Sequence, residues 1–100
     1  MMANYTVNFA KHATLTPSTV DTITVNQPAS FFLVTNRATS GGPIYFTLGD
    51  TLDKTAQPTV GGDDTFGIGL GVTVQIPFDG SPSYIRLISA NAQDYSVMVI

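Results

Sequence analysis

An acidic, glycine-rich segment is the first place where this sequence could bind a ligand. Gly61-Gly62-Asp63-Asp64 offers two adjacent carboxylates, and Asp50 and Asp53 lie in the same polar stretch. Calcium requires a cage of many oxygen ligands, and the common calcium-binding loop ends in a bidentate glutamate. The chain contains no glutamate. We therefore interpret Asp63 and Asp64 as turn residues and expect no metal ion or other cofactor.

A second candidate is the glycine pattern Gly67-Ile68-Gly69-Leu70-Gly71, which superficially resembles a phosphate-binding loop. Such a loop works because a helix begins directly behind the glycines and points its N–H groups at the phosphate. Here the alternating segment 72–76 follows, which predicts a strand. We expect these glycines to serve a close backbone approach or a bulge between two strands.

Nucleophilic catalysis would have to use His12, because it is the only histidine. The sequence also lacks the Gly-x-Ser-x-Gly motif in which many catalytic serines lie. We interpret His12 as solvated. Arg86 lies between two apolar residues of a predicted strand, and we expect it to reach solvent or pair with an aspartate rather than bind substrate. The chain is not expected to be an enzyme, and no catalytic residue is assigned.

Three tyrosines are the remaining candidates for binding chemistry. Tyr5, Tyr45 and Tyr84 could form a platform on which sugar rings stack, as in a carbohydrate-binding or host-adhesion module. Packing in the core or at a subunit interface is the interpretation that we favour for them. The carbohydrate-binding module is kept as an alternative function.

Composition excludes several classes of function. The chain has 100 residues, no cysteine, a net charge of −3 and only four basic residues. Without cysteine there are no disulfides, thiolate zinc sites or cysteine nucleophiles. Four scattered cations cannot form the basic patch that nucleic-acid binding requires. The apolar runs are far too short to cross a membrane, and we expect no targeting segment after Met1.

The elements that must position these residues are strands. Threonine, valine and isoleucine occur 14, 9 and 7 times, a composition typical of pleated, half-buried surfaces. Alternating or continuous apolar patterns bounded by turn residues predict about eight short strands, at 4–10, 20–26, 30–36, 43–48, 65–68, 72–76, 84–89 and 95–100. The segment 30–36 is apolar on both faces, which is typical of a central strand covered above and below.

These strands predict an all-β fold, an antiparallel two-sheet β-sandwich of the immunoglobulin-like or jelly-roll type. We expect one domain over residues 1–100, with 1–18 as an N-terminal edge strand or arm. Pro77 and the residues after it should break the strand 72–76, which would form a hairpin with 84–89. The segment 49–64 is expected to be a long exposed loop in which Thr59 and Val60 pair briefly.

Strand alternation also predicts the core and the edges of the sheets. The residues expected to be mostly buried are Phe31, Leu33, Ile44, Phe46, Val72, Val74, Ile76, Ile85, Leu87, Val97 and Val99. The segments 4–10 and 95–100 carry no charged side chain, and we expect them at sheet edges that invite partners. A homo-oligomer whose contacts include the N-terminal arm is therefore expected.

Five blocks of the sequence carry a resemblance to a known group of proteins. FLVTNRA (32–38), GPIYFT (42–47), PTVGGDDT (58–65), RLIS (86–89) and YSV (95–97) resemble small all-β virion proteins of tailed bacteriophages. The resemblance covers most of residues 20–99. It implies a virion structural protein, most simply a capsid decoration subunit that binds and stabilises the head shell, and it implies no catalytic residues.

The resemblance also carries expectations about partners and location. The partners would be the major capsid protein or other virion proteins, and the oligomer would be a trimer. The protein would be made in the host cytoplasm and reside in the virion, with neither nucleic acid nor membrane as a partner. A tail, neck or fibre component is the alternative within the same class.

Overall fold

The computed structural model describes residues 9–26, 29–51, 55, 57–62, 65–80 and 83–100. Within these residues the chain forms eight strands and no helix, which confirms the all-β prediction. The strands are β1 (Phe9–Thr14), β2 (Asp21–Val25), β3 (Ala29–Asn36), β4 (Ile44–Gly49), β5 (Phe66–Ile68), β6 (Thr73–Gly80), β7 (Ser83–Ile88) and β8 (Asp94–Val99). The described part of the chain has no helix that could span a membrane.

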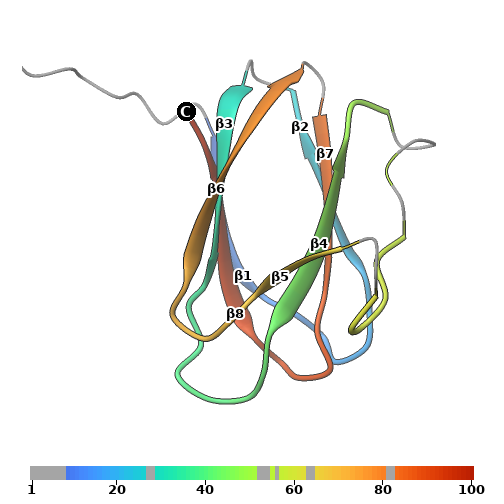
Figure 1. The fold of residues 1–100 in the computed structure, drawn as a ribbon, viewed down its shortest axis with the longest axis vertical. Coiled ribbons are helices and arrows are strands. Elements are labelled where there is room, and N and C mark those ends of the chain that lie inside the picture. The colour runs from blue at the N-terminus through green and yellow to red at the C-terminus, as the bar shows by residue number, and fades with distance from the viewer. Residues whose placement is uncertain (1–8, 27–28, 52–54, 56, 63–64, 81–82) are drawn as a thin grey trace, which may run out of the picture.

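The described strands form two antiparallel four-stranded sheets, which face each other in Figure 1. Sheet A has the order β1-β8-β3-β6, and sheet B has the order β2-β7-β4-β5. The pairing is nested, because β1 pairs with β8, β2 with β7, β3 with β6 and β4 with β5. A long antiparallel ribbon folded over itself in this way is a jelly roll. The sandwich prediction is confirmed, with the jelly-roll order rather than the immunoglobulin-like one.

The nesting also corrects the predicted hairpin. β6 pairs with β3 in sheet A, whereas β7 lies between β2 and β4 in sheet B. The hairpin prediction is wrong because the chain crosses from sheet A to sheet B between β6 and β7. Likewise, the segment 95–100 was expected at an edge, but β8 lies inside sheet A between β1 and β3.

Two strand boundaries differ from the prediction at the edges of sheet A. β1 begins at Phe9 and continues through the polar residues Lys11 and His12, while residues 1–8 lie outside the described part of the chain. β6 does not break at Pro77 but continues to Gly80. Both are edge strands, which can expose polar side chains to solvent and can accommodate a proline on the side without a neighbour.

The long connection between β4 and β5 is partly buried rather than fully exposed. Thr55 and Pro58 are buried, and the Thr55 hydroxyl donates to the Thr51 carbonyl over 2.6 Å. Thr55 packs closely on Gly49, where a Cβ atom would collide with it. The predicted pairing of Thr59 and Val60 is wrong, because these residues belong to a turn closed by the Gly62 amide and the Thr59 carbonyl at 3.0 Å.

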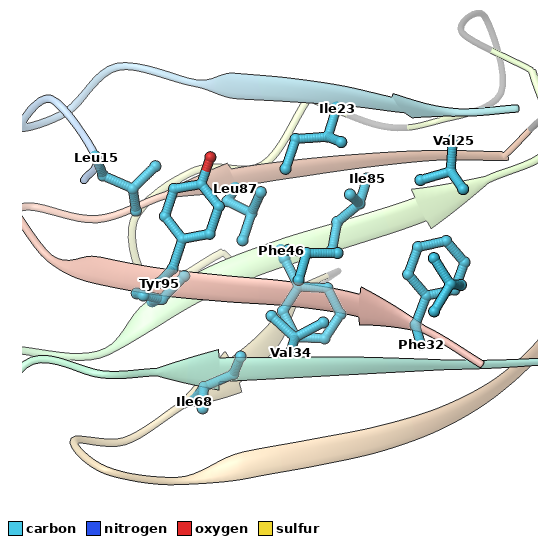
Figure 2. Packing of buried hydrophobic residues seen from close by; sticks show 13 residues of the cluster. Leu15, Ile23, Val25, Phe32, Val34, Phe46, Ile68, Ile85, Leu87 and Tyr95 are labelled. Atoms are coloured by element: carbon cyan, nitrogen blue, oxygen red, sulfur yellow. The ribbon is translucent and has the colours of Figure 1, made fainter. Parts of the chain in front are cut away.

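The core lies between the sheets and draws its buried residues from six of the eight described strands and from the segment after β1 (Figure 2). Its buried members are Leu15, Ile23, Val25, Phe32, Val34, Ile44, Phe46, Ile68, Ile85, Leu87, Tyr95, Val97 and Val99. Six predicted core residues are therefore confirmed: Ile44, Phe46, Ile85, Leu87, Val97 and Val99. Leu33, Val74 and Ile76 are only partly buried.

Two predicted core residues are wrong. Phe31 is 36% exposed and Val72 is 45% exposed. In β3 the inward residues are Phe32 and Val34, so only one face of this strand is covered by the other sheet. The run Phe31-Phe32-Leu33-Val34 is apolar on both faces, so alternation could not set its phase. Val72 precedes β6 and belongs to the turn that leads into it.

Candidate functional site

The acidic segment lies largely outside the described residues. Asp53, Asp63 and Asp64 are among the residues not described, and Asp50 is exposed. No group of three or more potential metal-ligating side chains gathers within the described ranges. The interpretation of Asp63 and Asp64 as turn residues therefore stays a prediction.

The glycine segment forms a tight turn between two strands. It begins with the last two residues of β5 and leads into β6, and the Val72 amide donates to the Gly69 carbonyl over 3.2 Å. Gly71 has a φ of 70°, a conformation that favours glycine. The Gly71 amide also donates to the Asn36 carbonyl at 2.9 Å. The strand β6 follows the glycines, as predicted, but the glycines form a turn that carries the chain from sheet B to sheet A rather than the expected bulge or close backbone approach.

His12 is exposed but takes part in a polar row on the outer face of sheet A. Its Nδ1 lies 2.6 Å from the hydroxyl of Ser96, directly opposite on β8. Two residues along, the Thr14 hydroxyl donates to Asp94 over 2.5 Å. These bonds join facing residues of β1 and β8, so they strengthen the attachment of an edge strand.

The described tyrosines do not assemble into a platform. Tyr45 on β4 and Tyr84 on β7 are both half-buried on the outer side of sheet B. Tyr84 lies opposite Gly49, four residues from Tyr45 along β4, a separation of about 13 Å at the usual rise per residue. Tyr5 lies outside the described residues. Arg86 is half-buried in the same face, opposite Thr22 on one side and Thr47 on the other.

A buried amide network, not singled out from the sequence, ties the loops at one end of the sandwich. Asn36 donates to the Gly42 and Ile68 carbonyls at 3.1 and 3.2 Å. Its side-chain oxygen accepts from the Gln93 amide at 3.2 Å and from the Ala38 backbone at 3.3 Å. Because these buried groups are satisfied, the network fixes loop positions. The signal in the sequence is a polar residue at an inward position of β3.

A second buried polar contact joins the two sheets. Tyr95 extends from β8 across the interior (Figure 2), and its hydroxyl donates to Asp21 of β2 over 2.7 Å. Burial, then the hydrogen bond to Asp21 and the charge of Asp21, raise the pKa of Tyr95 well above its ordinary value. The pattern of strands could not identify Asp21 as the polar partner of Tyr95, because the two residues are far apart in the sequence.

The surface feature that best fits a binding role is an apolar rim, which we define as Phe66, Leu70 and Val72. These side chains are 53%, 43% and 45% exposed. Phe66 is the first residue of β5, and Leu70 and Val72 lie in the turn between β5 of sheet B and β6 of sheet A. Phe66 stacks on the core residue Phe46, with ring centroids 5.2 Å apart. The sequence from 65 to 77 contains no charged residue. The three residues lie within seven positions of the chain, and exposed apolar patches mark surfaces where proteins bind one another.

Comparisons with known proteins add no relative. No family model matches the chain, and neither a curated protein nor a solved structure matches it.

Proposed function

We propose that this chain is a structural subunit of a tailed-phage particle, most simply a capsid decoration subunit bound to the head shell. The observation that carries the proposal is the apolar rim in an uncharged segment. The fold is compatible with it, since jelly rolls occur in capsid proteins, although they also serve other functions. The assignment to a phage particle depends on the sequence blocks that resemble small virion proteins.

In this role the rim would be the surface that meets the shell. Full burial of a large apolar side chain contributes about 1.5–3 kcal/mol. Because roughly half of each rim side chain is still exposed, covering all three would contribute roughly 2–4 kcal/mol per subunit. A contact of this size is weak alone. It becomes stable when each oligomer binds the shell at several points at once.

Two valine variants test the proposed contact. Val72 and Val60 are both 45% exposed, but Val60 lies in the β4–β5 connection and not in the rim. Val72→Asp introduces a charge into the rim, and Val60→Asp is the matched control. We expect Val72→Asp to weaken cosedimentation with undecorated shells at least about tenfold, because a carboxylate would have to be desolvated. Val60→Asp should bind within about threefold of the parent.

The position of the chain in the particle separates decoration from the alternative. Quantitative mass spectrometry of purified heads and tails should find hundreds of copies in the head fraction. A few copies confined to the tail fraction would instead support a tail, neck or fibre component. A chain that binds neither heads nor tails would contradict the proposal.

A further inference from the structure

The two described sheets have four edge strands, which differ in how well they resist pairing with another chain. These edges are β1 and β6 in sheet A, and β2 and β5 in sheet B. An edge strand presents unpaired backbone groups, so it is a template for another strand. Soluble proteins protect such edges with lysine, proline, bulges, inward charges or very short strands.

Three of these edges carry such protection. On β1, Lys11 shares the inward side with Phe9 and Ala13 yet remains exposed, so a charge stands at the edge of the interface between the sheets. On β6, Pro77 removes one backbone donor, and its pairing with β3 is shifted by an irregularity near Phe31. β5 has only three residues, one of which is glycine.

β2 has none of these features between residues 22 and 25. It is a regular strand, Asp21-Thr22-Ile23-Thr24-Val25, that pairs only with β7 among the described strands. Ile23 and Val25 are buried and point into the interior (Figure 2), while Thr22 and Thr24 are exposed. Its one charged residue, Asp21, lies at the end of the strand and accepts the Tyr95 hydrogen bond. β-branched residues of this kind favour strand pairing.

We propose that β2 is a self-association edge, at which β2 of a second copy pairs antiparallel about a two-fold axis through Ile23. This proposal depends on the comparison of the edges and not on the proposed function. An identical copy fits because residues 22–25 are uncharged. When two copies of this stretch pair, no charged side chain of one copy faces a like charge of the other. Centring the pair on Ile23 lets all five residues of both strands overlap, whereas any shift leaves some unpaired.

The two-fold axis determines which residues face each other and which assembly forms. Thr22 lies opposite Thr24 of the partner subunit, and Ile23 lies opposite Ile23 of the partner subunit. Sheet B of each copy then continues into the other, making one eight-stranded sheet. Such an isologous contact closes on itself, so it gives a dimer. For the contact through β2, this dimer replaces the trimer that the resemblance implies.

Charge placement at Thr22 and Thr24 tests the pairing and its register. In the double variant Thr22→Lys with Thr24→Lys, each lysine faces a lysine of the partner, so repulsion acts twice. In Thr22→Lys with Thr24→Glu, each lysine faces a glutamate of the partner, so the same two positions attract. The matched control is Thr73→Lys with Gln75→Lys, which places two lysines at the same spacing on the exposed side of the protected edge β6.

Sedimentation velocity of the full chain over a wide concentration range measures the outcome, with circular dichroism melts to verify folding. We expect a dimer that the double-lysine variant of β2 weakens at least about tenfold, with the lysine–glutamate variant and the β6 control within about threefold of the parent. A strictly monomeric parent, a trimer, or equal weakening by the β2 and β6 lysine pairs would overturn the proposal. Equal weakening by both β2 variants would overturn the two-fold register. None of these outcomes depends on whether the chain binds a phage shell.

Discussion

Tyr95→Phe removes one oxygen atom from the interior and leaves the ring in place. In the parent, this hydroxyl donates to Asp21 over 2.7 Å and so connects β8 of sheet A with β2 of sheet B. The Tyr95 side chain is fully buried, whereas Asp21 is half-buried. The variant therefore tests a single contact between the sheets without creating a large cavity.

The loss in the free energy of unfolding expected for Tyr95→Phe depends on the strength of the hydrogen bond to Asp21. A bond to a charged group contributes about 1.5–3 kcal/mol. Because water can partly replace the hydroxyl at half-buried Asp21, we expect a loss of about 2 kcal/mol in the free energy of unfolding at pH 7. For a domain of this size that loss lowers the melting temperature by roughly 8–16 °C.

The same contact gives a dependence on pH with a definite sign. Folding raises the pKa of Tyr95 above its unfolded value of about 10, chiefly because the group is buried. Its stabilising effect is therefore complete below pH 10 and is lost as the pH rises toward the folded pKa, by about 1.4 kcal/mol per pH unit. Tyr95→Phe lacks this loss, so the stabilities of parent and variant should converge near about pH 11.5.

Urea unfolding from pH 7 to pH 12 provides the measurement, and Tyr84→Phe provides the control. Tyr84 is half-buried on the outer face of sheet B. Its variant should lie within about 0.5 kcal/mol of the parent at pH 7 and keep the alkaline loss. The reasoning is refuted if Tyr95→Phe also stays within about 0.5 kcal/mol at pH 7 and loses stability in parallel with the parent above pH 10.

Three further predictions concern the core, the loops and the acidic segment. Phe46→Ala should lower the free energy of unfolding by about 3–5 kcal/mol in urea titrations, since this fully buried ring fills the core; a loss below about 1 kcal/mol would contradict its role. Asn36→Ala should lower the free energy of unfolding by about 2–4 kcal/mol, because it removes the donor to the Gly42 and Ile68 carbonyls and the acceptor for buried Gln93. An unchanged melting curve would argue against the network. EDTA should leave the melting temperature unchanged if Asp63 and Asp64 only shape a turn; a drop of several degrees would instead indicate a metal site.

The sequence pattern was sufficient to predict which residues of a strand are buried where one face of the strand is apolar and the other is polar. Ile85 and Leu87 of β7, and Val97 and Val99 of β8, lie inside as alternation predicted. The same method failed in β3, where both faces are apolar and the phase cannot be read. It also failed in β1, because the charged Lys11 lies between Phe9 and Ala13 on the inward side of this edge strand.

Pairing partners and the surface could not be predicted because they depend on residues far apart in the sequence. Jelly rolls and other sandwiches share the same strand signals, and the nested pairing of β1 with β8, β2 with β7, β3 with β6 and β4 with β5 separates them here. The rim residue Val72 was assigned to the core, since a strand pattern alone does not show where the preceding turn ends. Asn36 gave no recognisable motif, because its partner Gln93 is distant in the chain.

The nested pairing has a consequence for how the chain acquires its structure during synthesis. β8 fills the space between β1 and β3, so the first of these strands has no neighbour in sheet A until residues 94–99 have left the ribosome. A nascent chain that stops before Asp94 exposes β1 and one side of β3, together with the apolar residues that Val97 and Val99 would cover. Contacts between such distant segments form slowly, and the open strands are prone to aggregate in the meantime. Translation of the last strand, rather than of any earlier segment, is therefore the step that allows sheet A to close.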